Sequence, residues 1–171
     1  MSRLSGCFEN RKLKGETALI VYLVAGDPDT KTTAPLMHAM VSAGADIIEL
    51  GVPFTDPEAD GPVIQTGVER ALAQGMNLSR VLEMVSEFRN DDSQTPVVLM
   101  GYVNPIEVMG YSEFADRASK CGVDGTILVN LPPEEAELLD IELANVDMDP
   151  VYLLAPTTTE ARARKICSAS K

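Results

Sequence analysis

The sequence predicts an α/β fold built on a parallel β-sheet. Short apolar segments rich in β-branched residues alternate along the chain with longer segments whose apolar residues recur at helical spacing. The short segments are continuously apolar, which is typical of strands in a parallel sheet that helices cover. A cluster of polar or turn-forming residues follows each of them. These observations indicate five strand-and-helix units.

The first unit begins with an apolar strand expected at 18–25, which the Gly-Asp-Pro sequence at 26–28 ends. A helical pattern follows. Proline is tolerated in the first turn of a helix and disrupts its interior, so Pro35 indicates that this helix begins nearer Thr33 than Asp29 or is kinked.

The other four units follow the same pattern. They are expected as a strand at 46–51 with helices at 63–73 and 78–90, a strand at 97–102 with a helix at 111–121, a strand at 125–130 with a helix whose first turn holds 131–135, and a strand at 151–155 with a helix from 157–160 to Cys167. Prolines and glutamates favour a first helical turn, and Thr-x-x-Glu at 157–160 is a capping box. No linker or repeat indicates a second domain, so residues 1–171 are expected to form a single domain.

Two architectures accommodate such units: an open doubly wound sheet, and part of a (β/α)8 barrel. Polar residues follow the predicted strands, among them Asp60, Asn104, Asn130 and Thr157. They would ring the C-terminal mouth, where barrel enzymes carry their catalytic groups. No Gly-x-Gly-x-x-Gly sequence follows the first strand to indicate a dinucleotide site. The sequence therefore favours the TIM (β/α)8 barrel family, with about the first five β/α units in this chain.

Composition excludes several kinds of partner. Lys and Arg total 14 against 26 Asp and Glu, and this net charge of -12 would repel nucleic acid and anionic membranes. The apolar run at 18–25 is far shorter than the ~20 residues that span a bilayer. Cys7, Cys121 and Cys167 are widely spaced and form no Cys-x-x-Cys pair, which favours reduced thiols in a cytoplasmic protein.

Metal sites and covalent nucleophiles are not expected. The acidic sequence at 56–61 resembles the start of a calcium loop, but Gly67 stands where the bidentate glutamate belongs. His38 is the only histidine, so a histidine metal site or a His-based triad has no second imidazole to draw on. No Gly-x-Ser-x-Gly sequence marks a nucleophilic serine.

Glu49 is the most informative residue of the chain, because it interrupts an apolar strand. A carboxylate in such a strand costs several kcal/mol unless it is partnered or protonated. Two interpretations remain: a working carboxyl group with a raised pKa, or a carboxylate paired with a basic side chain across the sheet. Asp60, in the loop after the same strand, supplies a second carboxylate at the mouth of the sheet.

A series of ordered motifs runs through the chain. They are Ala25-Gly26-Asp27-Pro28, Glu49 to Pro57, Ala59 to Gln65, Leu99-Met100 with Tyr102, Asn104-Pro105-Ile106, Gly122-Val123-Asp124-Gly125 and Leu131 to Ala136. In this order they resemble the tryptophan synthase alpha subunit family. The resemblance implies a lyase of tryptophan biosynthesis that splits indole-3-glycerol phosphate by a retro-aldol step into indole and glyceraldehyde 3-phosphate.

The resemblance assigns the catalytic roles to Glu49 and Asp60. Cleavage needs a proton delivered to indole C3 and another removed from the side-chain hydroxyl. Glu49 is expected to move these protons because its apolar strand raises its pKa, whereas Asp60 stays ionised in its polar loop and holds the indole N–H. The indole-binding residues implied are Tyr22, Met100, Tyr102, Val129 and Leu153. Each of these is equally compatible with ordinary barrel core.

The resemblance also implies a partner, the tryptophan synthase beta subunit, in an alpha2beta2 assembly. The interface residues expected from it are Pro53, Phe54, Asp56, Pro57 and Asn104. No cofactor is expected in this chain, because pyridoxal phosphate belongs to the beta subunit.

Several residues depart from the family pattern. Glu58 adds a third acid to the loop, where repulsion is expected to loosen it or raise the pKa of Asp60. Asn130 stands in place of an aspartate, Gly101 in place of a larger residue, and Val24 where a polar residue is common.

Five units leave two functional hypotheses open. A complete barrel of this type has about 250 residues and grips phosphate with loops after its seventh and eighth strands. Five strands alone are expected to leave the first and fifth strands as unpaired edges. The chain is therefore expected to be the N-terminal portion of a lyase or, alternatively, a catalytically inactive fragment that binds the beta subunit.

Overall fold

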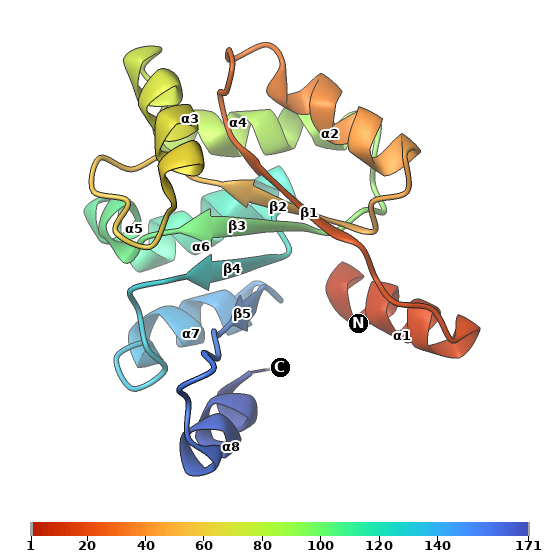
Figure 1. The fold of residues 1–171 in the computed structure, drawn as a ribbon, viewed down its shortest axis with the longest axis vertical. Helices are drawn as coiled ribbons and strands as arrows, with labels where there is room; N and C mark the ends of the chain where they lie inside the picture. Colours follow the sequence, from red (N-terminus) through yellow and green to blue (C-terminus); the bar gives the residue numbers. More distant parts are fainter. Residues whose placement is uncertain (1, 171) are drawn as a thin grey trace.

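A computed structural model describes residues 2–170 and shows a parallel sheet of five strands within them (Figure 1). The strands are β1 (Ile20–Val24), β2 (Ile47–Gly51), β3 (Val97–Gly101), β4 (Gly125–Leu128) and β5 (Asp149–Val151). They pair in the order β1-β2-β3-β4-β5, without the reversal that defines a doubly wound sheet. The fold class predicted from the sequence is confirmed, and β1 and β5 are the sheet edges.

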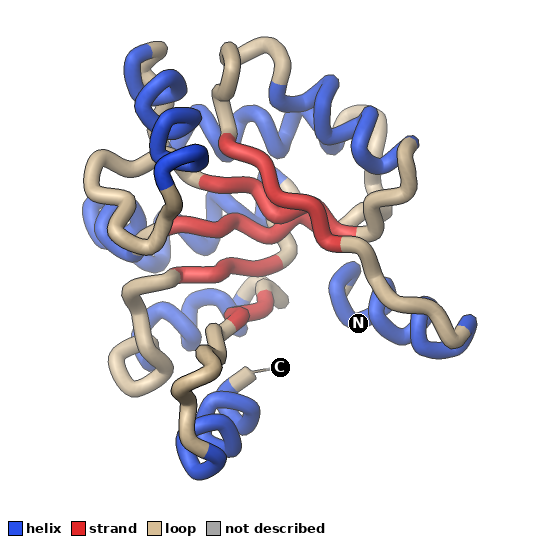
Figure 2. The backbone as a smooth tube through the Cα atoms, in the orientation of Figure 1, coloured by secondary structure: helices blue, strands red, loops and turns tan. Residues whose placement is uncertain are grey.

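The described residues also form eight helices, several of which cover one face of the sheet (Figure 2). They are α1 (Arg3–Lys14), α2 (Thr33–Ser42), α3 (Pro62–Ala73), α4 (Leu78–Arg89), α5 (Val103–Met109), α6 (Tyr111–Cys121), α7 (Glu137–Asn145) and α8 (Glu160–Ala169). Contacts run from α2 to α4, from α4 to α6 and from α6 to α7, as in the outer ring of a barrel. As Figure 1 shows, α3 and α5 lie at the end of the sheet toward which the strands point, and α1 lies at the opposite end.

The two faces of the sheet differ because successive strand side chains point to opposite sides. In β2, Ile48 and Leu50 are fully buried in the core that the helices form. Ile47, Glu49 and Gly51 point to the other face, which we call the inner face. At the N-terminal ends of the strands, Leu4 of α1 packs against Ile47 on this face.

Two helices were not predicted from the sequence. α1 is capped at its N-terminus by Ser2, whose side chain accepts a hydrogen bond from the Ser5 N–H, and at its C-terminus by Gly15 in the left-handed conformation (φ 68°). α5 differs from the expectation that Pro105 ends the third strand, because Pro105 stands in the first turn of this helix, where proline is tolerated.

Several predicted boundaries shift. The strand expected at 151–155 is instead Asp149–Val151, so 152–155 leave the sheet. The prolines and glutamates at 131–135 form a turn, and α7 begins only at Glu137. The start of α2 at Thr33 is confirmed. The capping box expected at 157–160 is wrong, because Thr159 caps α8 by accepting from the Arg162 N–H, and Glu160 is the first residue of the helix.

A buried ion-pair network ties α1 and α4 to the start of β4. The Asp124 carboxylate is 5% exposed and accepts hydrogen bonds at 2.8 Å from Arg3, from Arg89 and from the Val97 N–H. Because its charge is matched and its oxygens are hydrogen-bonded, Asp124 can be buried at the base of the strands.

Within residues 2–170, no helix has the length and apolar character needed to cross a membrane.

Candidate active site

Glu49 lies in the middle of β2 on the inner face. Its neighbours in register are Tyr22 of β1 and Val98 of β3. Burial raises the pKa of its carboxyl group, and no ion pair or hydrogen bond to that carboxyl occurs among the described residues. The interpretation that Glu49 pairs with a basic side chain across the sheet therefore has no support in residues 2–170. A half-buried carboxyl group with a raised pKa keeps its proton to higher pH than an exposed one, which suits a group that both donates and accepts protons.

Asp60 is held in the loop between β2 and α3 by three hydrogen bonds. Its carboxylate Oδ2 accepts one from the Tyr102 hydroxyl at 3.2 Å, and its carbonyl accepts one from the Gln65 amide at 2.8 Å. Its own N–H donates to the Pro57 carbonyl at 3.0 Å. Within residues 2–170, Oδ1 of the same carboxylate has no hydrogen-bond donor and stays free to accept one from a ligand.

Tyr22 covers the backbone of Gly51. A Cβ added at Gly51 would lie 2.3 Å from the Tyr22 hydroxyl oxygen and 2.7 Å from its ring carbon Cζ. Burial raises the pKa of Tyr22, and the carboxylates of Asp60 and Glu49 raise it further. Both predicted catalytic carboxylates thus raise the pKa of the same phenol group, so Tyr22, Glu49 and Asp60 lie close to one another.

The other predicted indole-binding residues divide into two groups. Met100 pairs with Gly51 in register, and Tyr102 is 4% exposed just beyond β3, so both lie beside the carboxylates. Val129 and Leu153 instead line a hollow of about 230 Å³ between the loop after β4 and α8. Leu153 is 56% exposed, so the described chain leaves more than half of it uncovered.

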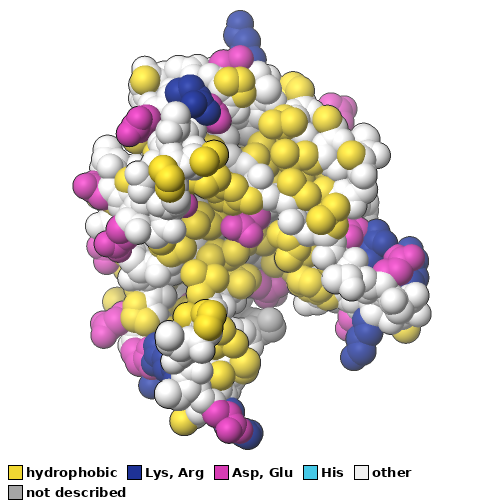
Figure 3. Space-filling view, viewed as in Figure 1, with side chains coloured by type: hydrophobic (Ala, Val, Ile, Leu, Met, Phe, Trp, Pro, Cys, Tyr) yellow, Lys and Arg dark blue, Asp and Glu magenta, His cyan; other side chains and the backbone are white. Residues whose placement is uncertain are grey.

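The inner face remains largely open. Figure 3 shows a broad hydrophobic surface across the centre of this view, with an acidic side chain within it. Large apolar side chains that stay exposed near β1 and β5 include Ile20 and Val151. A surface of this kind is typical of a binding or association surface.

The predicted partner residues are not all accessible. Asp56 and Asn104 are exposed, and Pro57 and Phe54 are partly buried, but Pro53 is buried within the chain. Pro53 as a contact residue is therefore not supported by its position.

Two of the accessible partner residues, Phe54 and Asn104, line an apolar hollow of about 540 Å³. Phe54, Asn104, Leu78 and Met109 are among the residues that line it. Val108, on the same hollow, is 90% exposed.

Two departures from the family pattern, Asn130 and Gly101, have local explanations. Asn130 accepts a hydrogen bond from the Val103 N–H at 2.9 Å and donates one to Asn104 at 3.0 Å, so it caps the start of α5. A Cβ at Gly101 would lie 3.2 Å from the Cβ of Val52, which explains a small residue there. The side chain of Glu58 is exposed.

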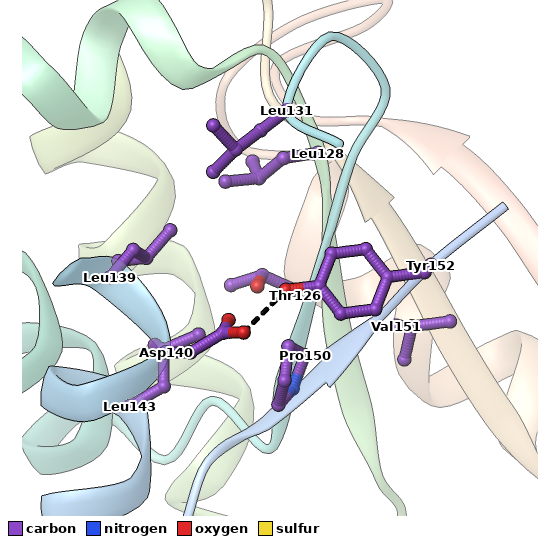
Figure 4. Close-up of a pocket in the computed structure, with 9 residues that line it drawn as sticks. All are labelled: Thr126, Leu128, Leu131, Leu139, Asp140, Leu143, Pro150, Val151 and Tyr152. Carbon is purple, nitrogen blue, oxygen red and sulfur yellow. Dashed lines mark hydrogen bonds between the residues drawn. The ribbon is translucent and has the colours of Figure 1, made fainter. Parts of the chain in front are cut away.

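A second small cavity belongs to the core and not to the candidate site. It lies between β4, β5 and α7 and has a volume of about 10 Å³, room for about one water molecule (Figure 4). On its wall Tyr152 donates a 2.6 Å hydrogen bond to Asp140, which ties the chain after β5 to α7 (Figure 4).

Comparison with known proteins identifies relatives over the whole chain. Residues 8–171 match the family model described as "Tryptophan synthase alpha chain". The tryptophan synthase alpha chain of Acinetobacter baylyi is 55% identical over 166 residues, which are 97% of this chain and 62% of that protein.

Solved structures give the same result. The crystal structure of tryptophan synthase subunit alpha from Legionella pneumophila superposes with a TM-score of 0.97 at 46% identity, over 100% of this chain and 65% of that one. A structure described as the tryptophan synthase a2b2 complex of Pyrococcus furiosus matches at 40% identity and a TM-score of 0.85, over 90% of this chain and 65% of that one. The chain thus spans less than two thirds of the length of these relatives.

Proposed function

Because the chain belongs to the tryptophan synthase alpha chain family, we propose that it acts as a carbon–carbon lyase on indole-3-glycerol phosphate, with Glu49 and Asp60 as its catalytic residues. The observation that carries the proposal is the isolated Glu49 carboxyl group on the inner face, with a pKa raised by burial. The neighbouring Asp60, whose Oδ1 is free, supplies the second group that the reaction needs. We also propose that residues 1–171 act as one domain, since one core cluster extends from β1 to α7.

The reaction breaks the bond between indole C3 and the hydroxyl-bearing carbon of the side chain. Protonated Glu49 delivers a proton to C3, so that the indole ring becomes an electron acceptor. Ionised Glu49 then takes the proton of the side-chain hydroxyl, and the C–C electron pair returns to the ring as the aldehyde forms. Indole and glyceraldehyde 3-phosphate leave, and the proton count of Glu49 is restored.

Asp60 contributes to the same reaction by electrostatic stabilisation of the indole ring. Positive charge develops on the indole ring when C3 is protonated, and the ring N–H becomes a stronger donor. The free Oδ1 of Asp60 accepts that N–H and stabilises the charge more in the transition state than in the ground state. Tyr22, Met100 and Tyr102 supply the apolar walls for the flat ring next to the carboxylates. Val129 and Leu153, which line the separate hollow beside α8, would contact the substrate farther from the carboxylates.

The partner in this proposal is a tryptophan synthase beta subunit. Phe54 and the exposed Asn104 line the apolar hollow of about 540 Å³, and Asp56 and Pro57 belong to the same loop as Phe54. An open apolar hollow with a polar rim suits a protein interface. The assembly would be alpha2beta2, as in the Pyrococcus complex, and pyridoxal phosphate chemistry would belong to the beta subunit.

Replacement of Glu49 by Gln tests the lyase. Gln keeps the size of the side chain and removes its titration, so indole release by the chain mixed with a beta subunit is expected to fall by about 100-fold or more. The control is Glu58→Gln, which removes an exposed carboxylate nearby and should leave the rate unchanged. Retained activity in Glu49→Gln would rule out the assignment.

The alternative is a partner-binding module without turnover. Its support is that the hollow beside Phe54 lies entirely within the described chain. Native chain that shifts the sedimentation of a beta subunit but releases no indole would establish the alternative. A chain that never co-sediments with the beta subunit would exclude it.

A further inference from the structure

One side chain, that of Tyr102, reaches both ends of the loop at 52–60, which carries Asp60. Tyr102 follows β3 directly and immediately precedes the first residue of α5, so a strand end and a helix start both fix its backbone. Its side chain is 4% exposed, in contrast to the loop, where Thr55, Asp56 and Glu58 are exposed. A buried residue on rigid elements therefore supports an exposed loop.

The hydroxyl of Tyr102 bridges two adjacent residues of the loop. It accepts a hydrogen bond from the Ala59 N–H at 2.9 Å and donates one to Asp60 Oδ2 at 3.2 Å. A phenol hydroxyl has one proton, so accepting from the amide leaves that proton for the carboxylate. Burial raises the pKa of Tyr102, and the Asp60 charge adds to the rise, so this proton is kept.

The ring of Tyr102 contacts the other end of the loop. Its centroid lies 5.3 Å from that of Phe54, with the ring planes tilted by 33°. This geometry lies in the range that favours aromatic pairs. Tyr102 thus links the start of the loop, beside the apolar hollow, to its end at Asp60.

We propose that Tyr102 is a positioning residue for Asp60: its hydroxyl fixes one carboxylate oxygen and the adjacent backbone, and so aims the free Oδ1 at the ligand. This proposal rests on the proposed function only for the identity of the ligand, an indole N–H. The orientation of Asp60 is a property of the chain itself and can be measured without turnover.

The test is Tyr102→Phe, which keeps the ring and its contact with Phe54 and removes only the hydroxyl. In the native chain, NMR couplings should show a single χ1 rotamer for Asp60 and a protected Ala59 amide. In Tyr102→Phe the couplings are expected to average over rotamers, and Ala59 is expected to exchange roughly fivefold to tenfold faster. The matched control is Tyr111→Phe, which removes a hydroxyl that donates to Glu107 at 3.0 Å outside the site.

Turnover gives an independent readout. In the chain mixed with a beta subunit, Tyr102→Phe should lower kcat by about tenfold or more with a smaller effect on KM, while the acid limb of the pH profile, assigned to Glu49, stays in place. An unchanged Asp60 rotamer and an Ala59 exchange rate within twofold of native would overturn the proposal. If instead Asp60→Asn left turnover intact, the proposed function would fail while the NMR result for Tyr102 still stood.

Discussion

The ring of Tyr22 lies against the backbone of Gly51, so close that no side chain fits between them. A Cβ at Gly51 would come within 2.3 Å of the Tyr22 hydroxyl oxygen. Tyr22 pairs in register with Glu49, two residues before Gly51 in β2, so this contact brings the phenol group over the inner face beside Glu49. The absence of a side chain at Gly51 therefore shapes the candidate indole site.

We expect Gly51→Ala to displace the Tyr22 ring, because the added methyl overlaps both the hydroxyl and Cζ. Overpacking of this kind costs typically about 1–3 kcal/mol of the free energy of unfolding. The measurement is urea unfolding of the single variant and of the double variant Gly51→Ala/Tyr22→Leu. The smaller side chain should restore part of the loss, and strictly additive costs would contradict the contact.

Glu49 should make stability fall as the pH rises. Its folded pKa is raised above the usual 4.5 by burial, so between 4.5 and the folded pKa the unfolded chain has already released the proton that the folded chain keeps. Folding is then penalised in this window, and the penalty persists at higher pH. The Tm of Glu49→Gln relative to native is expected to rise from pH 4 to pH 7. A difference independent of pH would show that the Glu49 pKa is not raised.

Loss of one arginine from the ion-pair network around Asp124 should lower the free energy of unfolding. Arg89→Ala leaves the Asp124 carboxylate, 5% exposed, with only the more exposed Arg3 as its ion-pair partner. Breaking a buried pair typically costs about 3–5 kcal/mol. The control Lys120→Ala removes an exposed pair with Asp116 and should cost less than about 0.5 kcal/mol in the same urea titration. Equal costs for the two variants would refute a structural role for the network.

Asn130 should stabilise the fold as a hydrogen-bond acceptor at the start of α5. Asn130→Ala leaves the Val103 N–H without its acceptor and is expected to cost about 1 kcal/mol of unfolding free energy. Asn130→Asp retains an oxygen in that position and should unfold close to native. A similar loss in both variants would mean that the amide nitrogen, which donates to Asn104, carries the effect.

The sequence was sufficient to predict the elements with strong periodicity and the two carboxylates of the candidate site. The β2 strand with Glu49 inside it and the loop with Asp60 follow from a carboxylate in an apolar run and from Pro and Gly spacing. The sequence did not predict the contacts that hold Asp60. Tyr102 lies 42 positions from Asp60 in the sequence, and only the pairing of β2 with β3 brings the two together.

Short elements were the hardest to predict. α5 has seven residues with proline in its first turn, and its cap from Asn130 comes from a loop 27 positions away. β5 has three residues, because the apolar sequence at 152–155 leaves the sheet and Tyr152 turns to Asp140 of α7. In both cases tertiary contacts override local propensity.

The most direct test of Glu49 as the acid and base follows the exchange of the indole C3 hydrogen in D2O by proton NMR. Exchange requires a group that delivers a deuteron to C3 and removes the original proton, and it does not require the phosphate part of the substrate. The native chain is expected to accelerate loss of the C3 signal above the spontaneous rate, and Glu49→Gln is expected to show the spontaneous rate alone. Equal acceleration by both proteins, or none by the native chain, would contradict the account.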